Sequence, residues 1–98
     1  MWIQTQNKQR TVNSDQIINI FVDKTGTKIM AETTRDGDFF TLGEYKDRDT
    51  CIKVLEHLSI GMVSNLPGVP MPLGGEVEDW TEGLEEIAAI NIVKGFRR

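Results

Sequence analysis

The sequence contains very few of the residues from which most catalytic and metal centres are built. Its 98 residues include one cysteine, Cys51, and one histidine, His57. A lone cysteine forms no disulfide within the chain, which fits a reducing compartment. On a helix these two residues would point about 240° apart, so they could not share a metal ion. We expect Cys51 in the core, His57 on a helix surface, no metal site and no cofactor.

The sequence also lacks long apolar runs and an apolar N-terminal signal. No run approaches the ~20 apolar residues that a membrane span needs, and residues 1–10 contain no secretion-signal stretch. Apolar residues make up 39% of the chain and charged residues 27%, a balance that is typical of a small globular domain. These features predict a cytoplasmic protein with no membrane partner.

Basic residues are missing from residues 61–93, although the net charge of the whole chain is only -4. An acidic surface repels nucleic-acid phosphates, so we expect no direct binding to nucleic acid. The acidic run is either a solvated helix face or a ligand for a basic surface, in which case its carboxylates imitate nucleic-acid phosphates. Its acids are Glu76, Glu78, Asp79, Glu82, Glu85 and Glu86, and Lys94, Arg97 and Arg98 follow them.

The first half of the chain has the alternating apolar pattern of β-strands. We expect an antiparallel meander of three strands, which the N-terminal strand joins, because Gly26 and Asp36-Gly37 are typical hairpin turns. In the second of these strands the alternation predicts that Ile18, Ile20 and Val22 face the core. The expected strands are residues 2–6, 16–23, 27–34 and 38–45.

Residues 47–62 have the periodicity of an amphipathic helix. Asp47 or Asp49 can accept a hydrogen bond from a free amide of the first turn, and Gly61 is expected to break the helix near its end. This helix should cover the apolar face of the sheet, which gives an α+β fold. The expected apolar stripe is Cys51, Leu55, Leu58 and Met62, with Ile52 and Val54 beside it.

The last third of the chain begins with three prolines and three glycines within residues 65–75. This composition predicts an extended segment outside any inner strand, with Val69 and Met71 against the body. Residues 79–92 can form a second helix, since Asp79 and Glu82 have capping-box spacing, although residues 90–93 could instead be a strand. We expect one domain: a core at 1–64, the extended segment at 65–75 and an acidic extension at 76–98.

The chain has more large apolar residues than one meander and one helix obviously bury. The C-terminal segment covers these residues, or they form a patch that marks an interface. The residues concerned are Trp2, Phe21, Phe39, Val69, Met71 and Trp80.

The order of the segments MWIQTQ, FFTLGEY, VLEHL and VPMP resembles a group of small proteins from phages, prophages and other mobile elements of Firmicutes. The resemblance covers roughly residues 1–73, and residues 74–98 look like an extension. It implies a β-meander, an LGxY strand end, a helix and a short Met-Pro segment. The group has no established activity, so the resemblance implies an accessory protein of a bacterial cytoplasm and no catalytic residues.

Because the residues for catalysis are missing, we expect a non-enzymatic protein that acts through protein–protein contacts. It could inhibit a bacterial defence system or modulate the host by meeting a basic surface. An enzyme would instead need a cleft that gathers His57 with carboxylates. The expected contact residues are Glu78, Asp79, Trp80, Glu82, Glu85 and Glu86.

The alternative is an oligomeric small-molecule-binding protein that sequesters a nucleotide-like signal. Its phosphate would meet arginine or lysine, and the Gly/Pro segment would line the pocket. Self-association is expected in both cases, because a small sheet leaves strand edges open. The expected ligand-binding residues are Arg35, Lys46, Arg48, Val69 and Met71.

Overall fold

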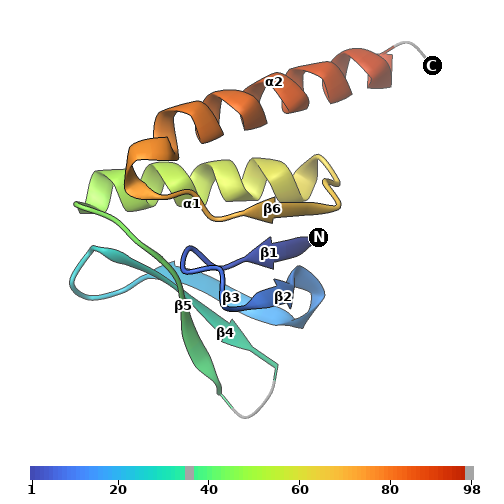
Figure 1. The fold of residues 1–98 in the computed structure, drawn as a ribbon. Coiled ribbons are helices and arrows are strands. Elements are labelled where there is room, and N and C mark those ends of the chain that lie inside the picture. Colours follow the sequence, from blue (N-terminus) through green and yellow to red (C-terminus); the bar gives the residue numbers. More distant parts are fainter. Residues whose placement is uncertain (35–36, 97–98) are drawn as a thin grey trace.

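A computed structural model describes residues 1–34 and 37–96, with side chains to residue 90. In the described residues, two helices lie above two small sheets (Figure 1). One sheet has the order β3-β4-β5, with strands Ile17–Val22, Lys28–Thr33 and Phe39–Glu44. The other has the order β2-β1-β6, with strands Thr11–Asn13, Trp2–Gln4 and Gly68–Pro70. The helices are α1 (Arg48–Val63) and α2 (Val77–Phe96), and short 3-10 turns are η1 (Ser14–Gln16) and η2 (Gly74–Glu76). This architecture confirms the expected α+β class.

The antiparallel meander forms as predicted from β3, β4 and β5. Gly26 and Gly37 take the positive φ of 79° and 67° that the two connections require, a region that glycine enters without steric cost. The prediction for Ile18 was wrong, since 62% of this residue is exposed. A register shift between Ile17 and Asn19 moves Ile18 out of the alternation, which is the known effect of a β-bulge. Ile20 and Val22 pack against the core as expected.

The N-terminal strand does not join the meander, and this expectation was wrong. Instead β1 pairs antiparallel with β2 and parallel with β6. Ile3 lies opposite both Val12 and Val69 in register, and all three are buried. Burial of these three apolar side chains, which come from distant segments of the chain, therefore stabilises the second sheet. Gln6 connects this sheet to β5, because its backbone amide donates to the Leu42 carbonyl at 2.8 Å and its side chain exchanges two hydrogen bonds with the Glu44 backbone.

Helix α1 begins where the sequence predicts and buries a wider face than predicted. The Asp47 carboxylate accepts hydrogen bonds from the Thr50 amide at 2.8 Å and from its hydroxyl at 2.7 Å. Val54 is fully buried, whereas Leu55 is only partly so. Gly61 is not the helix breaker, because α1 continues to Val63. Gly61 is buried beside Leu66, Leu84 and Val69. Cys51 lies in the core, as expected.

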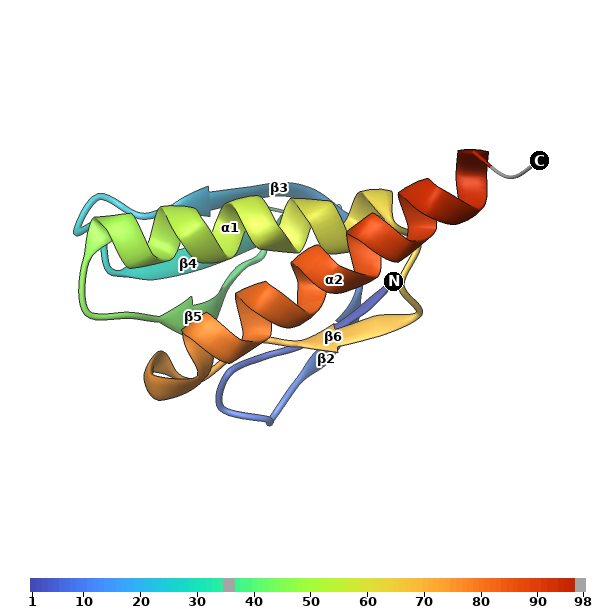
Figure 2. The same cartoon turned by 90° about the horizontal axis from the view of Figure 1, so that it is seen from above.

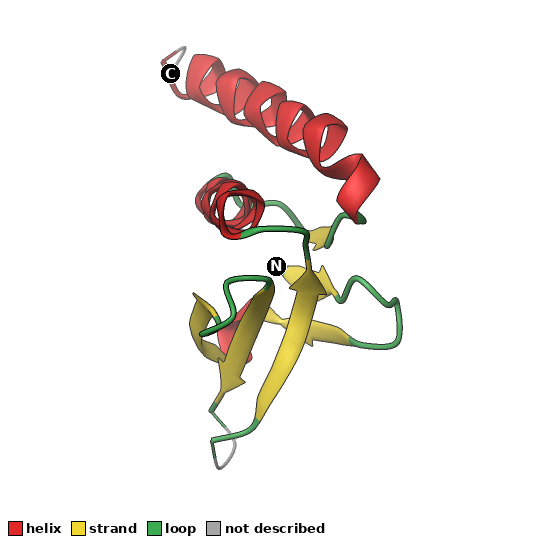
Figure 3. Ribbon diagram, turned by 90° about the vertical axis from the view of Figure 1, so that its left-hand side faces the viewer, coloured by secondary structure: helices red, strands yellow, loops and turns green. Residues whose placement is uncertain are grey.

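Helix α2 packs on the side of α1 that faces away from the sheets, so α1 lies between two apolar surfaces (Figures 1 and 3). It begins two residues before the predicted start at Asp79, and residues 90–93 are helical, so the strand alternative was wrong. Val69 and Met71 are buried as predicted. The C-terminal end of α2 extends past the end of α1 when the molecule is seen from above (Figure 2).

Gly43 of β5 has no room for a side chain. A Cβ atom there would lie 2.8 Å from the Tyr45 hydroxyl oxygen and 2.9 Å from its ring. We expect Gly43→Ala to lower the free energy of unfolding by about 1–3 kcal/mol, the usual cost of overpacking, as measured by urea denaturation. Gly74→Ala is the control, because open space surrounds that position, and it should change stability by less than about 1 kcal/mol. Equal effects of the two substitutions would contradict the steric explanation.

Candidate functional site

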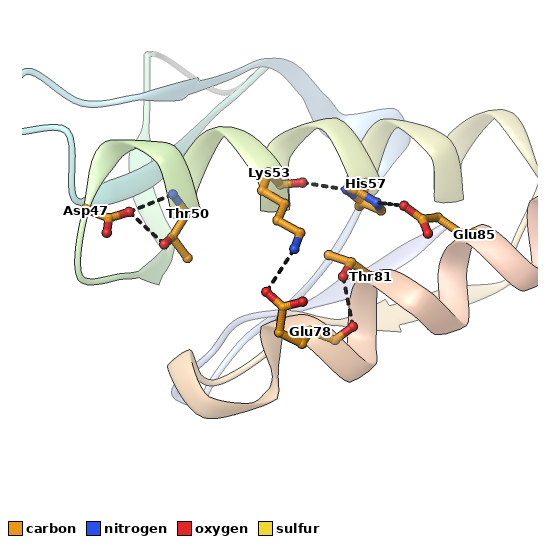
Figure 4. Close-up of polar contacts among 7 residues, drawn as sticks. All are labelled: Asp47, Thr50, Lys53, His57, Glu78, Thr81 and Glu85. Carbon is orange, nitrogen blue, oxygen red and sulfur yellow. Dashed lines mark hydrogen bonds and ion pairs between the residues drawn. The ribbon is translucent and has the colours of Figure 1, made fainter.

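The structure divides the acidic run between the two sides of α2. Glu78 and Glu85 face α1 and pair with Lys53 and His57 (Figure 4). The hydrogen bond from Lys53, at 2.9 Å, and the charge of Lys53 lower the pKa of the Glu78 carboxyl. The other acids of the expected contact set, Asp79, Glu82 and Glu86, are exposed. Glu78 and Glu85, although exposed themselves, therefore connect α2 to α1.

His57 is buried between the helices, so its expected place on the surface was wrong. Its Nδ1 lies 2.8 Å from the Lys53 carbonyl oxygen, and its Nε2 lies 2.7 Å from Glu85 Oε1. Both ring nitrogens of His57 therefore have a hydrogen-bond partner inside the protein. The periodicity of α1 could not reveal this burial, because the covering surface belongs to a helix twenty residues later in the chain.

Neither Cys51 nor His57 belongs to a reactive cluster. No group of three or more His, Cys, Asp and Glu side chains in the described part of the chain could hold a metal ion. Burial raises the pKa of the Cys51 thiol, and the charges of Asp23 and Asp47 raise it further. A buried thiol with a raised pKa remains protonated and is a poor nucleophile.

The residues expected to bind a nucleotide-like ligand are not gathered in one place. Arg35 lies outside the described residues. Lys46 and Arg48 are exposed at the start of α1, while Val69 and Met71 are buried around β6. Of the four described residues, only Met71 lines the larger of the two pockets discussed below.

An open pocket of about 550 Å³ lies between the segment after β6 and the first turns of α2. It brings together Met71, which was expected to bind a small ligand, and Asp79 and Trp80, which were expected to contact a partner protein. Sequence reasoning noted the VPMP segment and the acidic run separately and missed their contact. The lining residues are Gln4, Lys8, Pro70, Met71, Pro72, Leu73, Glu76, Asp79 and Trp80. A smaller pocket of about 260 Å³ lies beside β5 and is lined mainly by polar residues.

Hydrogen bonds hold the aromatic wall of the larger pocket in place. The Trp80 indole Nε1–H donates to the Pro70 carbonyl at 2.9 Å. The Met71 amide donates to the Gln4 carbonyl at 2.8 Å, which continues the pairing of β6 with β1. Trp80 is partly buried against the core, so one part of its side chain is packed while another lines the pocket.

The next two residues of the wall are fixed in the same way. The Pro72 carbonyl accepts from the Tyr45 hydroxyl at 2.8 Å and from Gln6 Nε2 at 3.1 Å. The Leu73 amide donates to Glu76 Oε1 at 3.0 Å. Proline restricts φ by itself, so this segment is ordered before any partner arrives. A preformed site avoids part of the entropy cost of binding.

The pocket combines apolar walls with an excess of negative charge. Lys8 is the base among its lining residues, whereas Glu76 and Asp79 are acids. Leu73 is 48% exposed, so its side chain adds apolar surface at the rim. A cation with an apolar stem matches this combination, because its charge meets carboxylates and its stem meets the tryptophan.

The large apolar residues that the sequence contains in surplus differ in their burial. Val69 and Met71 are in the core, whereas Trp2 and Phe39 are 54% and 53% exposed. Phe21 makes an edge-to-face contact with Phe39, with ring centroids 6.0 Å apart. The C-terminal segment thus covers part of the surplus apolar surface and leaves part of it exposed.

No family model, curated protein or solved structure matches the chain. Within the residues that the structure describes, no helix is both long and apolar enough to span a bilayer.

The stability of the protein should depend on the titration of Tyr45, whose hydroxyl donates to Pro72 behind the pocket. Burial, and to a smaller extent the neighbouring Cys51, raise the pKa of the Tyr45 phenol far above its ordinary value of 10.0. Above about pH 10 the unfolded chain loses this proton and the folded chain keeps it, so the free energy of unfolding falls as pH rises. We expect part of this fall to disappear in Tyr45→Phe, as measured by urea denaturation at about pH 8 to about pH 11. Identical pH profiles for the two proteins would contradict the assignment.

The His57–Glu85 contact should contribute measurably to stability. Glu85→Ala leaves His57 Nε2 without its acceptor, and we expect the free energy of unfolding to fall by about 1 kcal/mol. Glu56→Ala is the matched control, since that acid is exposed on α1 next to His57, and its effect should stay within about 0.5 kcal/mol. Chemical denaturation of both variants tests this, and equal losses would show that the contact is not stabilising.

Proposed function

We propose that this chain is a non-catalytic binding protein and that the pocket beside Trp80 receives a basic segment of a partner protein. The observation that carries the proposal is the fixed wall of residues 70–73 and Trp80 next to exposed carboxylates. Such a pocket matches protein recognition in which a few anchor residues fill preformed hollows.

The chemistry of the pocket favours arginine as the inserted side chain. The guanidinium group stacks on an aromatic face and pairs with carboxylates at the same time. Asp79 is exposed and lines the pocket beside Trp80. Glu76 already accepts a hydrogen bond from the Leu73 amide, which leaves Asp79 as the acid most available to a partner.

The resemblance to proteins of phages, prophages and other mobile elements supplies the biological setting of this proposal. In that setting the partner is a host or defence protein with a basic surface, and the chain inhibits or modulates it. Complementary charges between an acidic site and a basic partner mainly raise the rate of association and the specificity of binding.

The geometry supports the alternative, a protein that sequesters a nucleotide-like signal, less well. A phosphate in the pocket would lie near Glu76 and Asp79, with Lys8 as the compensating base among the lining residues. Phosphate sites normally rely on several arginine, lysine or backbone N–H donors. The lining residues include no Cys or Ser nucleophile, and Glu76 is already engaged by the Leu73 amide, so the pocket favours binding over covalent catalysis.

Reversal of the charge at Asp79 tests the proposal. A partner is first captured from host lysate, purified and titrated by calorimetry against the wild-type chain. We expect Asp79→Lys to weaken this binding at least about tenfold, because a cation then meets a cation.

Glu56→Lys is the matched control, because it makes the same charge change at an exposed acid of α1 that does not line the pocket. Its affinity should stay within about twofold of wild type. If Asp79→Lys binds as tightly as wild type, or if both variants lose affinity equally, the pocket is not the contact site.

A further inference from the structure

One surface of α2 is used neither by the core nor by the pocket. Ile87 is 36% exposed and Ile90 is 54% exposed, although both are large apolar residues. Both residues belong to the C-terminal half of α2, the helix whose end extends past α1 in Figure 2. Adjacent exposed isoleucines on a helix are typical of a surface that another helix covers.

The positions around these isoleucines follow the spacing of a coiled-coil seam. Residues 83, 87, 90 and 94 succeed one another at intervals of four, three and four, which keeps them on one stripe of a helix. Gly83 belongs to this stripe, and a Cβ atom there would meet nothing within 4 Å. A bare backbone position of this kind allows a second helix to approach closely.

The charges along α2 indicate which helix that is. Residues 76–86 carry six acids and no base, whereas Lys94 lies near the end of the helix and the sequence continues with Arg97 and Arg98. Two copies of such a helix attract each other when they run antiparallel and repel each other when they run parallel. The outer flank of the stripe carries Glu82 and Glu86, one turn apart and both exposed.

We infer that α2 forms an antiparallel pair with α2 of a second copy of this chain, about a twofold axis beside residues 88 and 89. In this register Ile87 packs against Ile90 of the partner subunit, and Lys94 lies opposite Gly83 of the partner subunit. The acids Glu82 and Glu86 then border the basic end of the other chain. The pairing is isologous, as a twofold dimer requires.

The dimer surface differs from the pocket proposed for the partner protein, since neither Ile87 nor Ile90 lines that pocket. The two proposals can therefore fail separately. Oligomeric state is measured on the purified chain alone, with no partner present.

Sedimentation equilibrium of the full chain over a range of micromolar concentrations tests the inference. We expect a monomer–dimer equilibrium that Ile90→Glu weakens at least about tenfold, because charge replaces an apolar contact on both sides of the axis. Val63→Glu is the matched control, since Val63 is 87% exposed on α1 and outside the stripe, and it should leave the equilibrium unchanged. Circular dichroism checks that each variant remains folded.

The charge arrangement is tested by reversal and rescue. Glu82→Lys with Glu86→Lys should weaken the dimer at least about tenfold, and adding Lys94→Glu should restore most of the lost affinity. Disulfide trapping fixes the direction, because Cys51 is buried and does not compete: mixed Gly83→Cys and Lys94→Cys chains should cross-link to each other. A chain that stays monomeric, a dimer that survives Ile90→Glu, or a reversal without rescue would overturn the inference.

Discussion

Parallel pairing of β6 with β1 is the interaction on which the rest of the structure depends. It joins the first residues of the chain to a segment more than sixty positions later and buries Ile3 against Val69. The Met71 amide extends the pairing by one more hydrogen bond, to the Gln4 carbonyl. The pairing places Pro70 and Met71, and the hydrogen bonds from Tyr45, Gln6 and Trp80 then hold the segment that leads to α2.

Helix α2 then covers the apolar surface of α1 that the sheets leave exposed. α1 is apolar on more than one face, and α2 covers the face that the sheets do not reach. Leu84 closes over Gly61, while polar contacts from Glu78 and Glu85 fix the direction in which α2 crosses (Figure 4). Two acids of α2 thus pair with α1, whereas Asp79 is exposed and lines the pocket.

The proposed binding surfaces both follow from this arrangement. The pocket exists because a proline-rich segment and the acidic start of α2 are held against each other by the Trp80 hydrogen bond. The exposed isoleucines Ile87 and Ile90 lie on a side of α2 that packs neither against the core nor into the pocket. Exposed apolar side chains that lie together on one surface are typical of interaction sites, which links these two surfaces to the proposed roles in association.

The sequence by itself determined the local elements. Alternation, the Asp36-Gly37 pair and the Asp47 cap depend on neighbours within a few residues, and they predicted the meander and α1 correctly. The second sheet, the burial of His57 and the pocket depended on residues that are far apart in the chain. The prediction for Ile18 was wrong for the same reason. A β-bulge depends on pairing with the neighbouring strand, and the alternation of apolar residues within one strand does not reveal it. Only the tertiary structure decided which distant surfaces meet, because apolar side chains specify that they are buried and do not specify against what.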